Sequence, residues 1–175
     1  FGQPRGWLRD AERVTRTIPP TPPIPLGEAV TVQASCVKMR KVEWLWPFRI
    51  PLGKLTTFAG LMGIGKTFLL CDIAARVSAG SFWPDVPDVC IDAGDVLFIS
   101  GEDEPEDTLV PRLMECGADL KRVRFLSLSA LIAFSLSNIS LLDRAARECD
   151  NLRLVIVDPP TSYLGDVDDH KNAEL

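Results

Sequence analysis

The sequence contains 175 residues, of which 46% are hydrophobic and 25% are charged, and its formal net charge is −5. The length suits one domain, or one domain with an arm, and the composition is that of an ordinary globular protein with a proper core. The negative charge argues against a broad surface that coats nucleic acid, but it does not exclude a local basic channel or one assembled from several subunits.

Cysteine usage and hydropathy indicate the compartment. The five cysteines are widely spaced and form no C-x-x-C pair, which favours reduced, mostly buried thiols over disulfides or a zinc site. No apolar run approaches the length of a transmembrane helix, and the polar, proline-rich N-terminus does not look like a signal peptide. We therefore expect a cytoplasmic protein with no membrane partner.

Residues 1–28 are predicted to form a proline-rich arm. Five prolines fall within residues 18–25, a composition typical of polyproline II or irregular chain. A plain linker is the favoured interpretation, and a docking segment for a neighbour is the alternative. Residues 29–175 are then expected to form the domain proper. It begins with a strand over residues 29–34 and an extended segment over residues 42–48, followed by a turn over residues 50–53.

A glycine-rich motif follows a predicted strand over residues 54–59. It reads Gly-x-x-x-x-Gly-Lys-Thr over residues 60–67 and is followed by a predicted helix, residues 68–77. Strand, glycine-rich turn and helix together are the context that makes this pattern a phosphate-binding P-loop, although a chance glycine turn before a helix is the alternative. The glycines let backbone N–H groups face phosphate oxygens, and the helix N-terminus adds partial positive charge. The predicted nucleotide-binding residues are Gly60, Leu61, Met62, Gly63, Ile64, Gly65, Lys66, Thr67 and Phe68.

Two residues of the motif have specific predicted roles. Lys66 supplies a positive charge to the β- and γ-phosphates of ATP, and Thr67 offers its hydroxyl to Mg²⁺.

Trp44 and Trp46 lie at i and i+2 of an extended segment, where they could border the adenine ring. The favoured interpretation of this pair is that it caps the core.

The rest of the chain alternates between helices and strands. The first helix stops at Gly80, and Pro111 should kink or split the second. This alternation predicts an α/β fold with a mostly parallel sheet flanked by helices. The expected elements are a loop at 81–92, a strand at 95–100, a helix at 105–116, a strand at 123–126, a loop at 127–137, a helix at 140–150, a strand at 152–158, a polar loop at 159–169 and the start of a helix at 170–175.

The strand at residues 152–158 ends in Asp158, after four apolar residues. This is a Walker B pattern, in which a buried strand brings a carboxylate to the sheet edge where ligands bind. Asp158 is therefore expected to hold Mg²⁺, directly or through its water. An apolar strand that ends in aspartate is a weak signal alone, but a strong one about ninety residues after a P-loop.

The general base must come from another strand, because Asp158 is followed by two prolines and not by an acid. Glu102 is the best candidate, since it follows the strand at residues 95–100 at the same sheet edge and could orient or deprotonate the attacking water. Asp103 and Glu104 are alternatives. All three could instead form the acidic start of the next helix, favoured by its dipole.

His170 is the only histidine and lies beyond the Walker B loop. It could sense the γ-phosphate or bind a neighbouring partner and is a further candidate catalytic residue. A solvated loop histidine is the more common case.

From about Trp44 to the C-terminus, the chain resembles the RecA-like ATPases, and among them the RepA-type hexameric replicative helicases. The family's catalytic glutamate falls on Glu102 and its Walker B aspartate on Asp158, and the stretch from His170 to Glu174 also belongs to the pattern. The segments that carry the resemblance are residues 51–56, 74–80, 96–108, 112–113, 117–120, 157–159 and 169–174.

Two departures from the family pattern stand out. Residues 61–64 read Leu-Met-Gly-Ile, where relatives have an Asp-Pro-Gly-Val type of run. The chain also ends before the strand that would lie between the P-loop and Walker B strands, and before the arginine finger and the DNA-contacting loops. We therefore expect it to be the N-terminal part of a longer RecA-like domain.

The resemblance implies Mg²⁺-dependent ATP hydrolysis, with ATP and ADP bound at the interfaces of a homo-oligomer, a hexamer, and an arginine supplied by a neighbour. It also implies work on single-stranded DNA as a replicative helicase or in a related role. The alternatives are a non-catalytic nucleotide-binding regulatory module and a P-loop small-molecule kinase. A kinase would need an acceptor site and an arginine-rich lid, and the sequence contains neither.

Overall fold

The computed structural model describes residues 31–137 and 139–164. The chain divides into two units, residues 1–41 and residues 42–175. In the first unit, residues 31–41 are exposed and contain one short 3-10 helix, η2 (Ala34–Cys36). The strand predicted for residues 29–34 is wrong over its described part, because no neighbouring strand there takes up its backbone hydrogen bonds. The predicted arm, residues 1–28, lies outside the described residues.

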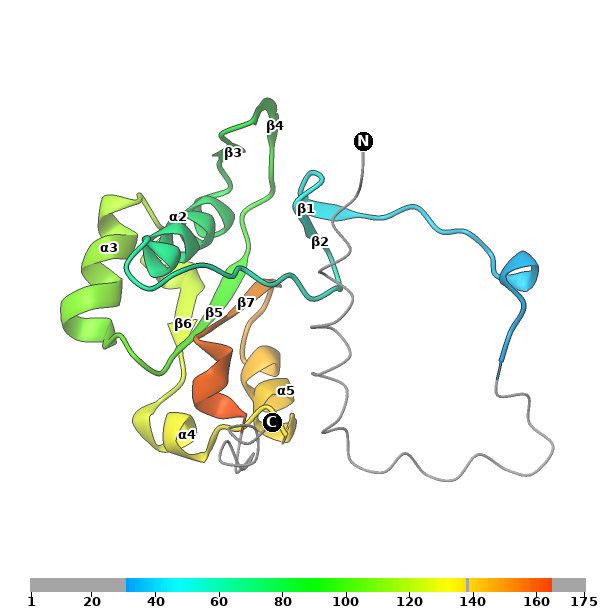
Figure 1. The fold of residues 1–175 in the computed structure, drawn as a ribbon. Helices are drawn as coiled ribbons and strands as arrows, with labels where there is room; N and C mark the ends of the chain where they lie inside the picture. Colours follow the sequence, from blue (N-terminus) through cyan, green and yellow to red (C-terminus); the bar gives the residue numbers. More distant parts are fainter. Residues whose placement is uncertain (1–30, 138, 165–175) are drawn as a thin grey trace. The chain divides into compact units, whose positions relative to one another are not determined.

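A parallel three-stranded sheet organises the second unit. Its strands are β5 (Asp95–Ser100) in the centre, β6 (Val123–Phe125) at one side and β7 (Leu152–Asp158) at the other (Figure 1). Phe98 of β5 pairs with Phe125 and with Ile156, and Ser100 pairs with Asp158. The predicted strands at 95–100, 123–126 and 152–158 are confirmed, and all three have their carboxyl ends at one edge.

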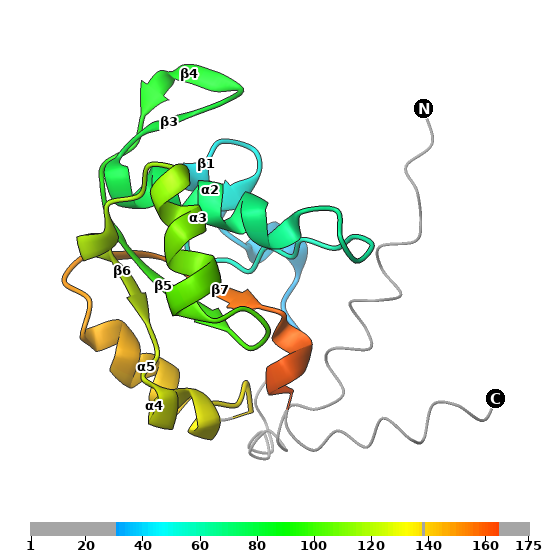
Figure 2. The same ribbon diagram turned by 90° about the vertical axis from the view of Figure 1, so that its left-hand side faces the viewer.

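Helices cover both faces of this sheet. Successive side chains of a strand point to opposite faces, so β5 contributes to two cores. Val96 and Phe98 belong to one cluster with α2 (Lys66–Ala79) and α3 (Val110–Glu115), whereas Leu97 and Ile99 belong to a second cluster with α5 (Ser140–Arg147) (Figure 2). The four β5 side chains are at most 2% exposed, which explains why the strand reads as a continuous apolar run.

Helix α2 is bounded by two glycines. Gly65 precedes it with φ 86° and Gly80 follows it with φ 67°, both in the left-handed region that favours glycine. A Cβ at Gly80 would also lie 2.9 Å from the backbone nitrogen of Ala93. The helix and its end at Gly80 are confirmed.

The helix predicted over residues 105–116 has two parts. A π-helical turn, η3 (Pro105–Leu109), precedes α3, which ends just before the left-handed Gly117. Pro111 has no N–H to bond the carbonyl four residues earlier, so an α-helix tolerates it only in its first turn, and α3 begins directly before it. The predicted split is confirmed.

Two small hairpins and a short helix complete the fold; β1 (Trp44–Trp46) lies in the segment predicted as extended, and the other elements lie in segments predicted as turns or loops. β1 pairs with β2 (Ile50–Pro51), and β3 (Phe82–Trp83) pairs with β4 (Val86–Cys90), both antiparallel. α4 (Leu128–Ala133) lies in the stretch predicted as the loop at 127–137. Two further 3-10 turns, η4 (Leu120–Arg122) and η5 (Pro160–Tyr163), complete the described elements.

Long-range aromatic packing explains the hairpins. Trp83 is fully buried, stacks on Trp46 with ring centroids 4.5 Å apart, and donates its indole N–H to the Leu45 carbonyl at 2.8 Å. These side-chain contacts hold β3 against β1, and the local sequence does not reveal that the two segments meet. The core-capping interpretation of the tryptophans holds for Trp46, which is 9% exposed, but not for Trp44, which is 36% exposed.

The strand predicted over residues 54–59 is not formed among the described residues. The segment has no assigned strand conformation, and Leu55 is 89% exposed. A strand needs a neighbour for its ladder hydrogen bonds, and no described strand pairs with this segment.

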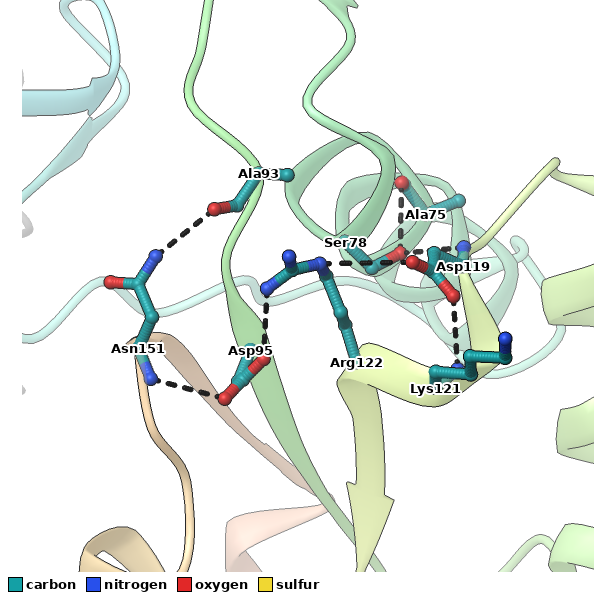
Figure 3. Close-up of polar contacts among 8 residues, drawn as sticks. All are labelled: Ala75, Ser78, Ala93, Asp95, Asp119, Lys121, Arg122 and Asn151. Carbon is teal, nitrogen blue, oxygen red and sulfur yellow. Dashed lines mark hydrogen bonds and ion pairs between the residues drawn. The ribbon is translucent and has the colours of Figure 1, made fainter.

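Polar contacts at the amino ends of the strands hold the sheet to α2 (Figure 3). Asp95 is 6% exposed; its carboxylate accepts hydrogen bonds from Arg122 at 3.4 Å and from the Asn151 backbone N–H at 3.1 Å. The Ser78 hydroxyl on α2 accepts from the Asp119 N–H at 3.1 Å and donates to the Ala75 carbonyl. We call this group of contacts the structural joint. It lies at the amino ends of the strands, and Asp158 lies at the opposite end.

None of the helices in the described part of the chain is long and apolar enough to cross a membrane.

Candidate nucleotide-binding site

The glycine-rich loop immediately precedes α2, so the first amide groups of that helix adjoin the loop. Gly63 has φ 78° and Gly65 has φ 86°, conformations that side chains with a Cβ rarely adopt. A Cβ on Gly60 would collide with the Ile64 side chain. The exposed apolar side chains of this loop include Met62, which is 98% exposed, and Ile64, which is 63% exposed. This loop can present a row of N–H donors to an anion at the helix N-terminus.

Lys66 opens α2 and folds back over the loop. Its ammonium donates to the carbonyls of Gly60 at 3.2 Å and of Leu61 at 3.0 Å. An ammonium carries three hydrogens, so one donor is left for a phosphate oxygen. Phe68, the last residue of the predicted nucleotide set, lies in the first turn of α2 and is 55% exposed.

Thr67 and Asp158, which are 91 positions apart in sequence, are in direct contact. The Thr67 hydroxyl donates to the Asp158 carboxylate with an Oγ1–Oδ2 distance of 2.7 Å. Thr67 lies in the first turn of α2, and Asp158 lies at the carboxyl end of β7. The two oxygens therefore meet at the edge of the sheet that also carries the loop.

These two oxygens suit a hard divalent cation. The threonine hydrogen is used by Asp158, which leaves the hydroxyl lone pairs available to a metal. Mg²⁺ is typically held by one or two protein oxygens together with substrate phosphates and waters, and not by a dedicated cage. Among residues 31–137 and 139–164, no group of three or more His, Cys, Asp or Glu side chains could hold a metal.

The three acidic candidates for the base differ in their surroundings. Glu102 is exposed on the turn that follows β5. Asp103 is engaged, because its carboxylate binds Arg112 at 3.1 Å and its N–H donates to the Ser100 hydroxyl at 3.0 Å. Glu104 directly precedes the turn η3. Of the three, Glu102 combines an exposed carboxylate with a position next to the strand ends.

The turn that carries Glu102 is fastened to Asp158 through the backbone. The Gly101 N–H donates to the Asp158 carbonyl at 3.1 Å. A Cβ on Gly101 would lie 2.9 Å from the Tyr163 hydroxyl oxygen and from Ser162 Cβ. Glycine is therefore favoured where this turn approaches η5.

Two residues at this edge, Arg112 and Tyr163, were not predicted from sequence as site residues. Arg112 reaches the acidic turn from α3. Tyr163 is 6% exposed, and its hydroxyl has no hydrogen-bond partner within the described part of the chain. Burial raises the pKa of Tyr163, and the nearby Asp158 charge raises it further. An arginine after an acidic turn was visible in the sequence, but nothing local indicated that it reaches Asp103.

The structure thus brings Lys66, Thr67 and Asp158 to the carboxyl edge of the sheet, and the turn that carries Glu102 is attached to Asp158. His170 lies outside the described residues.

The sequence comparison identifies the family. A family model described as an AAA domain matches residues 20–175, a range that includes the loop, the acidic turn and Asp158. No curated protein and no solved structure matches the chain significantly, and the family match does not single out the RepA-type helicases. A parallel three-stranded sheet flanked by helices, with the loop at the start of α2, is the α/β P-loop type of fold expected for a nucleotide-binding ATPase domain. The chain belongs to the AAA domain family.

Proposed function

We propose that this protein hydrolyses ATP with Mg²⁺ at the site formed by the glycine-rich loop, Asp158 and Glu102. The observation that carries the proposal is the 2.7 Å contact between Thr67 and Asp158. It joins a residue beside the phosphate loop to a carboxylate at the strand end, which is the pairing that a nucleotide-bound Mg²⁺ requires.

In the proposed reaction, each residue has a distinct task. Lys66 and the loop N–H groups, from Gly60 to Thr67, hold the phosphates, and Thr67 and Asp158 would hold Mg²⁺, which neutralises phosphate charge when bound. Glu102 orients the attacking water and accepts its proton. The water oxygen bonds to the γ-phosphorus, the bond from that phosphorus to the bridging oxygen breaks, and ADP leaves with that electron pair.

We also propose that hydrolysis drives work on single-stranded DNA, in the manner of a RepA-type replicative helicase. The support is the resemblance over the segments before and after the P-loop and around Glu102 and Asp158. In this proposal, ATP binds at subunit interfaces of a hexamer, a neighbour supplies an arginine, and His170 senses the γ-phosphate. Fold alone does not determine such an output, so DNA dependence is tested separately.

The decisive experiment compares wild type with Glu102→Gln and Lys66→Ala in the full-length protein. Glu102→Gln should lower kcat by about 10²- to 10⁴-fold, the usual contribution of a general base, while ATP binding measured with a fluorescent analogue is retained. Lys66→Ala should weaken ATP binding itself. Glu106 is an exposed acid of the following turn, so Glu106→Gln is the matched control and should have the kcat and the ATP binding of wild type.

Three outcomes would contradict the proposal in different ways. Unchanged hydrolysis by Glu102→Gln would show that the base is elsewhere. ATP binding without turnover in the wild type would favour a regulatory module, and turnover only with an added acceptor would favour a kinase. Turnover that does not rise with single-stranded DNA would remove the helicase assignment but leave the ATPase.

A further inference from the structure

The turn after β5 is held in place by three hydrogen bonds around Glu102. On one side, the Gly101 N–H donates to the Asp158 carbonyl at 3.1 Å. On the other side, the Asp103 N–H donates to the Ser100 hydroxyl at 3.0 Å, and the Asp103 carboxylate binds Arg112 at 3.1 Å. Glu102 is the residue between these anchors, and its own side chain is exposed. The direction of its carboxylate therefore depends on how firmly its two neighbours are held.

Arg112 is the anchor that ties this turn to a helix. The other two contacts are made by groups at the ends of the strands β5 and β7, whereas Arg112 comes from α3. Leu109 and Leu113, on either side of Arg112 in sequence, are both fully buried in the cluster that contains α2. The guanidinium therefore projects from a packed element.

The Arg112–Asp103 pair is partly buried. Its side chains are 39% and 30% exposed, compared with 76% and 62% for the Arg147–Asp143 pair on α5. The charges of both Arg112 and Asp103 also act on Cys71, one turn beyond Thr67 on α2. The pair thus lies close to the helix that begins at the phosphate loop.

We propose that Arg112 is a positioning residue for ATP hydrolysis: by binding the Asp103 carboxylate, it holds the turn so that the Glu102 carboxylate faces the attacking water. This inference rests on the proposed function of the site. It also assigns Asp103 a role other than base, since its carboxylate is used in the ion pair. Arg112 acts through Asp103 and Glu102 and does not touch the nucleotide.

The test is a double-mutant comparison in the full-length protein, with hydrolysis followed at steady state and ATP binding measured separately. Arg112→Gln should lower kcat by about tenfold to 100-fold, the scale expected when a reacting group is misplaced by about an ångström, with ATP affinity and KM unchanged. Arg112→Lys should recover part of the rate, because it restores the positive charge but not the planar fork. In a Glu102→Gln background, Arg112→Gln should cause no further loss, since both changes remove the same contribution.

The controls separate positioning from folding and from a failure of the proposed activity. Arg147→Gln removes the exposed α5 pair and should hydrolyse ATP like wild type, and thermal unfolding of each variant reports its fold. A wild type that turns over ATP, with an equally active Arg112→Gln, would overturn the inference and leave the ATPase assignment intact. Weaker ATP binding by Arg112→Gln or Arg112→Lys, or a further rate loss in the Glu102→Gln background, would also overturn it, because Arg112 would then act directly on the nucleotide. A wild type without turnover would refute the proposed function itself.

Discussion

Cys71 illustrates how the site affects a single residue. It lies on α2 one turn beyond Thr67 and is fully buried. Burial is the main cause that raises the pKa of its thiol to about 11; Cys116, Asp103 and Asp158 contribute to this rise, while Arg112 opposes it. The thiol is therefore neutral at physiological pH and inert toward electrophiles, because the thiolate is the reactive form.

This raised pKa predicts a specific loss of stability in alkali. The folded state favours the neutral thiol, so the contribution of Cys71 is complete below its ordinary pKa of 9.0 and is lost as the pH rises toward about 11. The free energy of unfolding in urea should therefore fall more steeply between pH 9 and 11 in wild type than in Cys71→Ala. Cys36→Ala, which removes an exposed thiol, is the matched control. Equal slopes for wild type and Cys71→Ala would contradict the prediction.

At the scale of elements, α2 is fixed at both of its ends. Its first turn is tied to β7 by the contact between Thr67 and Asp158, and its last turn is tied to the segment before η4 by Ser78 and Asp119. The helix therefore spans from the candidate site at the carboxyl edge to the structural joint at the amino edge.

We predict that Ser78→Ala weakens the joint at the amino edge without harming nucleotide binding. The Ser78 side chain is fully buried, and its loss would leave the Asp119 N–H without that partner, at a cost of roughly 1–3 kcal/mol in unfolding free energy. Urea unfolding measures this change, and a fluorescent ATP analogue should bind as in wild type. Ser129→Ala on exposed α4 is the control and should change stability by less than about 0.5 kcal/mol. A similar effect of both substitutions would argue against a joint at Ser78.

At the scale of the molecule, the second unit presents its candidate site on an open edge. Leu61, Met62 and Ile64 of the loop are 80%, 98% and 63% exposed, an apolar group next to the proposed phosphate site. Such exposure is consistent with the proposed oligomer, in which a neighbouring subunit covers the nucleotide and contributes an arginine.

Specific activity is therefore predicted to depend on protein concentration. If an arginine from a neighbour completes the site, turnover per subunit of the full-length protein should fall on dilution in parallel with dissociation of the oligomer, because such arginines contribute about 10³- to 10⁵-fold to turnover. Sedimentation and ATPase rates over the same dilution series measure the two quantities. Constant turnover per subunit while the oligomer dissociates would show that each site is complete in one chain.

Local signals in the sequence determined the loop, the strands β5, β6 and β7 and the ends of α2. Gly65 and Gly80 bound that helix because their left-handed conformations interrupt it, and the apolar run of β5 reflects burial on both sheet faces. These features depend on neighbouring residues or on a periodicity of a few positions, so they are readable without a structure. The same reading placed Glu102 after β5 and Asp158 at the end of β7.

Only the tertiary structure decided which of these side chains meet. The contacts of Thr67 with Asp158 and of Asp103 with Arg112, like the stacking of Trp46 on Trp83, join residues that the chain brings together only when its elements pack. Strand formation has the same dependence: residues 54–59 have β-prone composition but no described ladder partner, whereas Phe82–Trp83 form a strand in a segment predicted as a loop. A strand is stabilised by hydrogen bonds to a neighbour and not by its own residues, so composition can indicate a candidate strand while the fold decides whether it pairs.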